Sequence, residues 1–472
     1  GEVEEAAGAA DAAIIVVSGK AGVEVGTQKA WELCDKYKLP RMVFVTDMDI
    51  DNASYRQVVE DMTALYGKKI APFHLPIREN EKFVGYINVV SEKAYRWQGK
   101  EVVECDIPDY SKSNLQICRD TLLEAVAETS EEFMERYFGG ESFSEAEIRA
   151  AMRTNVDDGS IVPMSMGSNV LCQGIYTLLD DIVKYLPSPE GREIAGINMK
   201  TKEIYQANYD FAKAKSAFIF KTIVDPFIGK YSLIKVCSGV LKPDDQLFNY
   251  DKDVEEKIGK LYVLQGNKPI EVSELHAGDI GALAKLTGAR TGNTLSTKNT
   301  PIEYGKTEIS VPYTYKRYKA KNKGDIDKIS QSLTKMMHED LTLKVVNDSE
   351  NHQSLLYGMG DQHLDVVVSR LINEYKVEIE LSKPKVAFRE TIRKKSDVEY
   401  KYKKQTGGHG QYGHVKMRFE PSGDLETPYV FEQEVVGGAI PKNYFPAVEK
   451  GLQESVQKGP MAAYPVVGVK AV

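Results

Sequence analysis

The sequence is poor in cysteine and has no long hydrophobic segment. Its five cysteines are odd in number, and no two of them form a CxxC pair. This pattern argues against a zinc site or a disulfide framework, and it favours a protein of the reducing cytoplasm. The longest apolar run, Ala12 to Val17, is far shorter than the ~20 residues that a membrane helix needs. No membrane partner is therefore predicted.

The sequence also lacks an excess of positive charge and an N-terminal targeting signal. Lys and Arg number 61 against 69 Asp and Glu, which gives a formal net charge of -8. Any contact with RNA must therefore come from a local basic patch. Gly1 is not followed by the basic and apolar regions of a signal peptide, and Pro465–Val472 stops within an alternating strand pattern. We interpret both ends as cut from a longer protein.

The first part of the chain has the pattern of an α/β domain. Residues 1–190 alternate short apolar runs, such as 41–45, with segments of helical spacing, such as 25–38 and 55–66. Ser54 is placed to cap the second of these helices. This alternation predicts a parallel sheet with covering helices. Interrupted strand-like residues at about 70–110 predict an inserted subdomain. The length of 472 residues predicts further domains.

The periodicity changes to strands after a stiff, proline-rich linker at 186–189. Residues 191–307 have short strands separated by Gly and Pro turns, which predict a β-barrel. Residues 308–384 have the split βαβ pattern of a ferredoxin-like domain. Residues 385–472 begin with strands, carry a glycine-rich turn at 407–413 and contain one helix. The predicted fold class is multidomain α/β and β.

The first candidate site follows the predicted strand at 41–45, whose carboxyl end carries acidic residues. Ligands bind at that edge in open α/β sheets. Asp47, Asp49 and Asp51 alternate as in a calcium loop, although position twelve is Val58 rather than Glu. Aspartyl phosphatases also place Asp-x-Asp after an apolar strand, with one Asp as nucleophile. The remaining interpretations are an exposed acidic loop and a base-recognition loop, in which the Asp49 carboxylate accepts two hydrogen bonds from guanine.

The second candidate site is the glycine-rich segment Gly407–Gly413. Its glycines let backbone N–H groups approach an anion closely, but no Gly-Lys-Ser/Thr follows as in a Walker loop. Residues 389–418 hold nine Lys and Arg against three Asp and Glu, a net of +6, with tyrosines interleaved. Cations and aromatic rings on a flexible loop suit irregular RNA. A solvated hairpin explains the composition equally well.

Two histidines lie in other turns, and we interpret both as structural. His276 stands between predicted barrel strands, and His363 follows Asp361, which is suited to cap the next helix. No Ser, His and Asp, and no Cys and His, have a spacing that indicates covalent catalysis. We therefore predict no catalytic residue and no metal ligand in this chain.

Taken in order, seven motifs resemble elongation factor G over essentially the whole chain. They are Asp225–Lys230, His276–Ile280, Gly358–Leu364, Lys383–Thr391, Gly407–Gly413, Gly437–Pro441 and Gly459–Val469. The first two resemble that factor's barrel, the next two its third domain and the junction with the fourth, and the last three its fourth domain. Single motifs are modestly specific, but their order over about 250 residues is highly specific.

The resemblance implies a partial P-loop GTPase domain, a barrel, a ferredoxin-like domain and a partial α+β domain like those of ribosomal proteins. Asp49 is implied to bind guanine, assisted by Thr46 and Ser168. The implied RNA-binding residues are Lys404, Gly407, Gly408, His409, Gly410, Gln411 and Tyr412. The implied cofactors are GTP and Mg²⁺, and the implied partners are ribosomal RNA and ribosomal proteins. A cytoplasmic monomer is expected.

The sequence departs from the family at the implied guanine site. Family members have Asn-Lys-x-Asp where this chain has Thr46-Asp47-Met48-Asp49, and the later Ser-Ala appears, partly altered, as Gly167-Ser168-Asn169. Thr46 offers a hydroxyl in place of an amide, and Asp47 replaces a cation that packs over the base. This loop is more similar to a paralogue than to the housekeeping factor. The phosphate loop and both switches, one with the catalytic histidine, are expected before Gly1.

The function that the resemblance implies is a ribosome-binding GTPase that couples GTP hydrolysis to a step such as translocation. Two other interpretations stay open. One is a non-enzymatic ribosome-binding factor whose altered guanine loop reflects lost GTPase activity. The other is a ribosome-protection protein that displaces a drug, because such proteins share this domain order.

Overall fold

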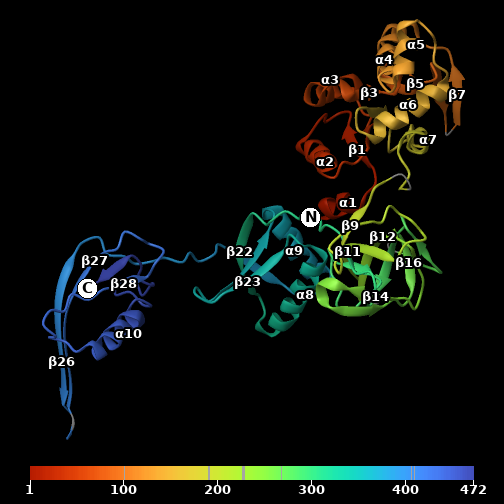
Figure 1. Ribbon diagram of the computed structural model, residues 1–472. Coiled ribbons are helices and arrows are strands. Elements are labelled where there is room, and N and C mark those ends of the chain that lie inside the picture. Colours follow the sequence, from red (N-terminus) through yellow and green to blue (C-terminus); the bar gives the residue numbers. More distant parts are fainter. Residues whose placement is uncertain (100, 190–191, 226–228, 267, 406, 409) are drawn as a thin grey trace. The chain divides into compact units, whose positions relative to one another are not determined.

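The computed structural model describes residues 1–99, 101–189, 192–225, 229–266, 268–405, 407–408 and 410–472 (Figure 1). The chain divides into two compact units. The first contains Gly1–Val311 with Gln331–Thr342, and the second contains Pro312–Ser330 with Leu343–Val472. Within the described ranges, no helix combines the length and the apolarity needed to cross a membrane.

The first unit begins with the predicted parallel sheet. Its strands are β1 (Ala13–Ser18), β2 (Arg41–Thr46), β3 (Ile70–Pro72) and β8 (Val162–Met166), in the order β1-β2-β8-β3, and all neighbours are parallel. Helices α2 (Val25–Lys36) and α3 (Tyr55–Tyr66) connect its first three strands in the sequence, and α7 (Ile175–Tyr185) follows β8. Ser54 caps α3, as its position predicts, because its side chain accepts a hydrogen bond from Gln57 N. The expected alternation of strand and helix is confirmed.

An inserted subdomain follows β3. Its antiparallel sheet has the order β4-β5-β6-β7 and consists of β4 (His74–Glu79), β5 (Lys82–Asn88), β6 (Lys93–Gln98) and β7 (Glu101–Cys105). Helices α4 (Asp109–Ala127), α5 (Glu131–Phe138) and α6 (Glu145–Asp157) come next. β3 pairs with β8 of the parallel sheet, so the separate sheet begins at His74. One hydrophobic core runs through both sheets, which makes the insert part of the same packed body.

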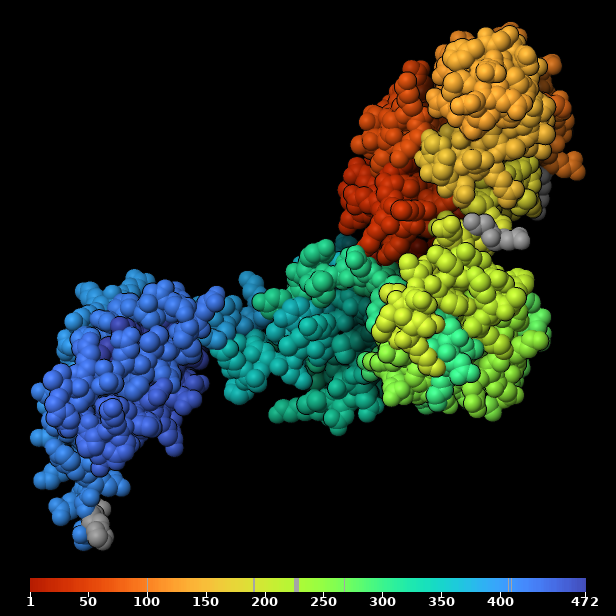
Figure 2. Space-filling model, viewed as in Figure 1, coloured from red at the N-terminus to blue at the C-terminus, as the bar shows by residue number. Residues whose placement is uncertain are grey.

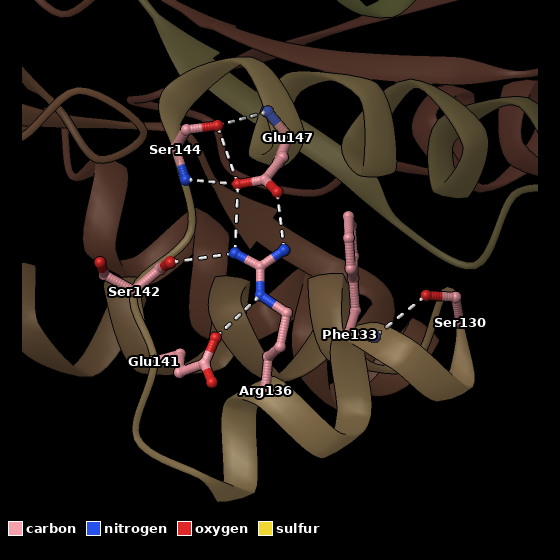
Figure 3. Close-up of polar contacts among 7 residues, drawn as sticks. All are labelled: Ser130, Phe133, Arg136, Glu141, Ser142, Ser144 and Glu147. Atoms are coloured by element: carbon pink, nitrogen blue, oxygen red, sulfur yellow. Dashed lines mark hydrogen bonds and ion pairs between the residues drawn. The ribbon is translucent and has the colours of Figure 1, made fainter.

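A single arginine holds α5 to the start of α6 (Figure 3). Arg136 Nη1 donates to Glu147 Oε1 at 2.7 Å, and the guanidinium lies over the rings of Phe133 and Phe143. Glu147 also accepts from Ser144 N at 2.7 Å, which completes a capping box for α6. These contacts, first of all the Arg136 hydrogen bond, lower the pKa of Glu147 to about 2. Hydrogen bonds and ring contacts of Arg136 and Glu147 thus hold the connection between the two helices in place.

The β-barrel domain follows in the same unit. Its main sheet is antiparallel throughout, with the order β15-β14-β20-β11-β12-β19-β16-β17 (Figure 1). Residues of these strands form much of the apolar core of the domain. Two small sheets, β10-β9-β21 and β13-β18, complete the domain. The strands of all three sheets are β9 (Ala195–Asn198), β10 (Ile204–Gln206), β11 (Ser216–Asp225), β12 (Gly229–Ser238), β13 (Val240–Leu241), β14 (Gln246–Asn249), β15 (Val254–Lys257), β16 (Leu261–Gln265), β17 (Lys268–Val272), β18 (Leu275–His276), β19 (Ile280–Ala284), β20 (Thr294–Ser296) and β21 (Ile302–Glu303).

The short helix α1 (Glu2–Ala9) packs against the barrel strand β11. Its acidic side chains form several of the contacts. Glu2 Oε1 pairs with Lys221 Nζ at 2.9 Å, and Glu4 Oε2 accepts from Ser310 N at 3.0 Å. Glu5 is only 1% exposed, and its Oε2 has no hydrogen-bond partner among the described residues. Burial is the main cause that raises the pKa of Glu5 to about 7.

The raised pKa of Glu5 predicts a pH-dependent stability. Between about pH 4.5 and pH 7 the folded protein holds a proton that the unfolded chain releases, so the free energy of unfolding falls as the pH rises through this window. We expect Glu5→Gln to be more stable than the wild type at pH 8, by roughly 2 kcal/mol, and equally stable at pH 4.5. Urea unfolding at both pH values measures this difference. Glu2→Gln, at an exposed position, is the control and should show no such pH dependence.

The second unit begins with the ferredoxin-like domain. The strands of this domain are β22 (Thr314–Ala320), β23 (Lys344–Asp348), β24 (Gln353–Gly358) and β25 (Ile379–Ser382), and its helix α9 spans Asp361–Asn373. Helix α8 (Ile326–Glu339) lies between β22 and β23 in the sequence, and its residues from Gln331 onward belong to the first unit. The antiparallel sheet has the order β23-β24-β22-β25, as the split βαβ pattern predicts. The expected cap at Asp361 is wrong, because Gly360 is the N-cap of α9 and Asp361 is the first residue inside the helix. Asp361 instead pairs with Lys316 of β22 at 3.0 Å.

The last part of the second unit is a smaller α+β structure. Its sheet has the order β26-β27-β29-β28, with β26 (Ser396–Gln405), β27 (Gly410–Pro421), β28 (Tyr429–Phe431) and β29 (Val469–Ala471). Helix α10 (Phe445–Ser455) lies between β28 and β29 in the sequence. Only Phe419–Pro421 of β27 pair with β29, so most of the β26–β27 hairpin has no other described strand beside it.

Candidate functional site

The three strands β1, β2 and β8 bring their carboxyl ends to one edge of the parallel sheet. Ser18 is paired with Thr46, and Val45 is paired with Met166. The alignment continues beyond β1, because Gly19 N donates to Thr46 O at 2.8 Å. This is the edge at which ligands bind in open α/β sheets.

The loop after β2 and the loop after β8 are joined directly. Met48 N donates to Gly167 O at 3.2 Å, and Thr46 Oγ1 donates to Asn169 Oδ1 at 3.1 Å. Two of the three predicted guanine-binding residues, Thr46 at the end of β2 and Ser168 on the loop after β8, thus stand on adjoining segments. Their side chains do not bond each other, since the partner of Thr46 is Asn169.

Asp49, the third predicted residue, is exposed at this edge. Asp47, two positions earlier, has a φ of +62°, a left-handed conformation that Asp adopts more readily than most residues. Within the described ranges, no hydrogen bond or ion pair engages the Asp49 carboxylate. Its oxygens are therefore available as acceptors for two N–H donors of a ligand. The described residues contain no group of three or more His, Cys, Asp and Glu that suits a metal ion, so Asp47, Asp49 and Asp51 do not form a calcium cluster here.

Ser168 is fully buried and stabilises its own loop. Its Oγ accepts from Leu171 N at 3.0 Å, and its backbone N–H donates to Gln173 O at 2.9 Å. A Cβ at the preceding Gly167 would lie 2.2 Å from Gln173 O and 2.7 Å from a ring carbon of Phe44. Only glycine fits at that position. The Ser168 hydroxyl is already bonded within the loop, and its role toward a base stays a prediction.

The predicted RNA-binding segment lies at the end of the β26–β27 hairpin. Gly410, Gln411 and Tyr412 belong to β27, where Gln405 pairs with Gly410 and Lys404 pairs with Gln411. The predicted turn over Gly407–Gly413 is therefore too long. Pairing extends to Gln405 and Gly410, and only residues 406–409 connect the strands. Gly407 has a φ of +81°, and Gly408 is exposed. The predicted residue His409 lies outside the described residues.

The hairpin exposes aromatic rings and cations on both faces. Tyr402 and Lys404 alternate on one face, where Tyr402 OH donates to Gln411 Oε1 at 3.4 Å. Lys403 and Tyr412 are paired on the other face, and the Tyr412 side chain is 64% exposed. In the space-filling view the described end of the hairpin stands clear of its sheet (Figure 2). The predicted residues that can be described are thus brought together on one accessible ribbon.

The motifs do not indicate two residues that make contacts at these sites, namely Asn169 at the sheet edge and Glu399 on the hairpin. Asn169 meets Thr46 from 123 positions away in the sequence. Glu399 lies diagonally across the hairpin from His414 and accepts from its Nε2 at 2.7 Å. Lys416 binds the same carboxylate at 3.0 Å, and hydrogen bonds from Lys416 and His414 lower the pKa of Glu399. Glu399 thereby neutralises part of the charge at the base of the hairpin and leaves Lys401, Lys403 and Lys404 nearer its end.

Comparison with known proteins assigns this arrangement to a family. Four known domain families match consecutive parts of the chain. They are the elongation factor Tu GTP binding domain at residues 1–188, elongation factor G domain 2 at 214–298, elongation factor G domain III at 309–383 and elongation factor G domain IV at 384–472. A crystal structure of a protein from Thermus thermophilus is 36% identical and superposes with a TM-score of 0.85. The match covers 100% of this chain and 68% of that one.

The chain belongs to the elongation factor G family of translational GTPases. The elongation factor Tu GTP binding domain contains the edge formed by β1, β2 and β8, and this domain implies binding of GTP, usually with Mg²⁺. Domain IV contains the β26–β27 hairpin. The two candidate sites of this elongation factor G relative therefore lie in different domains.

The sheet edge fits the base of GTP. Asp49 offers an unengaged carboxylate, and guanine presents two adjacent donors, N1–H and the exocyclic amine, to such a group. Thr46, the last residue of β2, stands three positions before it and donates to Asn169 of the second loop. These residues would bind and orient the base. None of the residues described at this edge is assigned to the phosphates or to Mg²⁺.

Proposed function

We propose that the protein is a ribosome-binding GTPase that couples GTP hydrolysis to an elongation step such as translocation. The observation that carries this proposal is the continuous order of a GTP-binding domain and three elongation factor G domains over the chain. GTP bound with Mg²⁺ supplies a cleavable phosphate whose presence orders switch segments, and hydrolysis releases them. Its site of action would be the cytoplasm, with ribosomal RNA and proteins as partners, and the protein would act as a monomer.

At the sheet edge, Asp49 would discriminate guanine from adenine. A carboxylate accepts from both guanine donors, whereas adenine has no N1–H and presents no exocyclic amine at that position. Thr46 would contribute its hydroxyl, and Ser168 would act through the loop that it shapes. Asp47 cannot supply the cation–π contact of the lysine that the family carries there.

At the other site, the hairpin would contact ribosomal RNA. Lys404, Gly407, Gly408, Gly410, Gln411 and Tyr412 stand at its described end, and His409 would act with them. Lysines would bind phosphates, and the exposed ring of Tyr412 would stack on an unpaired base. The glycines would let the backbone approach the RNA closely.

GTP hydrolysis by the intact protein, measured with and without ribosomes, tests the proposed function. We expect slow hydrolysis alone and strong stimulation by ribosomes, because ribosome binding is the proposed trigger of hydrolysis. Substitution of Lys401, Lys403 and Lys404 by Glu should weaken ribosome binding and raise the ribosome concentration needed for half-maximal stimulation. The absence of hydrolysis, together with intact ribosome binding, would reject the enzymatic proposal.

Intact ribosome binding without GTP hydrolysis would favour a non-enzymatic ribosome-binding factor. Two features of the structure favour this alternative. Asp47 stands where the family has a cation, and the Thr46 hydroxyl is engaged with Asn169 rather than free for the base. Weak or absent GTP binding by the intact protein would then accompany the loss of hydrolysis.

A further inference from the structure

One face of the four-stranded sheet in the ferredoxin-like domain is partly exposed. Side chains alternate between the two faces along each strand. On β24, Gly358 faces α9, because a Cβ there would lie 2.8 Å from Leu364 Cδ2. On β22, Lys316 reaches Asp361 at the start of α9. Residues with even numbers on β22 and β24 therefore face α9, and the odd-numbered residues form the opposite face, here called the outer face.

Two tyrosines stand side by side on the outer face. Tyr315 of β22 is paired directly with Tyr357 of β24. Their ring centroids are 4.8 Å apart and the ring planes differ by 22°, so the rings are stacked. Tyr315 is 43% exposed, so part of this stack is accessible to a ligand.

Cations surround the tyrosine stack. Lys344 is paired with Tyr357, and Arg317 and Lys319 follow Tyr315 at alternate positions on β22. Within the described ranges these three cations have no ion pair, and Arg317 Nε is buried without a hydrogen-bond acceptor. Positive charge beside an aromatic stack suits phosphates that flank a base.

The acidic groups of the outer face lie away from the stack. Asp348, at the far end of β23, receives hydrogen bonds from Asn351 Nδ2 and Gln353 Nε2, each at 2.8 Å. Gln353 Nε2 also donates to Lys385 O, and Gln353 Oε1 accepts from Lys385 N. The segment that leads out of the domain thus crosses the Gln353 end of the face. Glu380, paired with Lys319, is the remaining acid among the described residues of this face.

We propose that the outer face of this domain binds unpaired RNA bases through the Tyr315–Tyr357 stack. Four-stranded sheets of this βαββαβ topology bind RNA in the same way when aromatic residues stand on their two central strands, and β22 and β24 are the central strands here. A base stacks on the exposed part of Tyr315, and Arg317 and Lys344 bind the adjoining phosphates. This site is separate from the hairpin and does not depend on GTP.

Binding of a fluorescently labelled, unstructured RNA of about 12 nucleotides to the 472-residue chain tests this proposal. Fluorescence anisotropy is measured on the variant with Lys401, Lys403 and Lys404 replaced by Glu, so that the hairpin contributes little. In that background, Tyr315→Ala and Tyr357→Ala should each weaken binding about tenfold, the usual effect of losing one stacked aromatic side chain. Arg317→Ala should also lower the salt dependence of binding by about one phosphate contact.

Two control variants identify stacking as the cause. Tyr315→Phe keeps the ring and should bind like its parent, whereas Tyr313→Ala removes a tyrosine that is 78% exposed but lies before β22 and should change nothing. Thermal unfolding verifies that all variants are folded. The proposal is overturned if the parent does not bind RNA, or if Tyr315→Ala and Tyr357→Ala bind as tightly as Tyr313→Ala. Unchanged binding after the hairpin substitutions alone would instead contradict the RNA contact proposed for the hairpin.

Discussion

Asp49→Asn should convert a preference for GTP into a preference for XTP. The asparagine amide presents a donor to the exocyclic amine of guanine, so two charge-assisted hydrogen bonds are lost and two donors face each other. Such losses amount to about 3 kcal/mol, or roughly a hundredfold in affinity. Xanthine carries a carbonyl oxygen in place of the amine, and the same amide then donates to it while its oxygen accepts from N1–H. Competition of GTP and XTP for a fluorescent nucleotide bound to the intact protein measures the change.

Asp51→Asn is the matched control for this experiment. Asp51 is another exposed carboxylate of the same loop, and its substitution removes an equal charge. We expect GTP and XTP to bind this variant as they bind the wild type. Equal selectivity of Asp49→Asn and Asp51→Asn would show that Asp49 does not contact the base, even if both variants bind nucleotide less well.

The elements that follow from local sequence pattern could be predicted closely. The strand expected at 41–45 is β2, and the helix expected at 55–66 is α3 with Ser54 as its cap. Apolar periodicity and capping depend on neighbouring residues, so a single sequence contains them. The length of the glycine-rich turn at 407–413 was harder to predict, because Gly410 adopts a strand conformation when it pairs with Gln405. Cross-strand pairing overrides the local preference of glycine for turns.

Contacts between distant segments could not be predicted. Thr46 bonds Asn169 because β2 and β8 are parallel neighbours, and nothing in either loop specifies that partner. Tyr315 and Tyr357 are stacked because the register of β22 and β24 places them opposite each other. In the sequence they are two of 26 tyrosines, and nothing there indicates that they are paired. Candidate site residues could be named from motifs, but their hydrogen bonds depend on the tertiary structure.

The contacts of Asp11 with distant residues could likewise not be predicted from the sequence. Substitution of Asp11 has the largest expected effect on the free energy of unfolding. Asp11 follows α1, and its carboxylate binds Lys235 Nζ of β12 and accepts from Tyr209 OH at 2.7 Å. The Lys235 side chain is only 5% exposed, and burial is the main cause that lowers its pKa. Lys235 Nζ also donates to Ala9 O at 2.6 Å. The ammonium group is therefore removed from water, and Asp11 is its counter-ion.

Asp11→Ala should lower the free energy of unfolding of the first unit by about 3–5 kcal/mol. The substitution leaves a buried ammonium group without its carboxylate, which costs far more than the loss of an exposed ion pair. Without Asp11 the pKa of Lys235 falls further, so between that lowered pKa and about pH 10.5 the folded variant binds fewer protons than its unfolded chain. Its stability should therefore rise with pH, and the deficit relative to the wild type should shrink toward about pH 10. Urea unfolding between about pH 7 and pH 10 measures both effects.

Two further variants separate this buried pair from ordinary surface charge. Glu2→Ala breaks the pair with Lys221, in which the Glu2 side chain is 74% exposed, and should cost less than about 1 kcal/mol. Asp11→Ala combined with Lys235→Met removes both charges, and it should recover much of the stability because an apolar side chain tolerates burial. If Asp11→Ala is no more destabilising than Glu2→Ala, or if Lys235→Met restores nothing, the ammonium group is hydrated in solution and Asp11 is not its necessary partner.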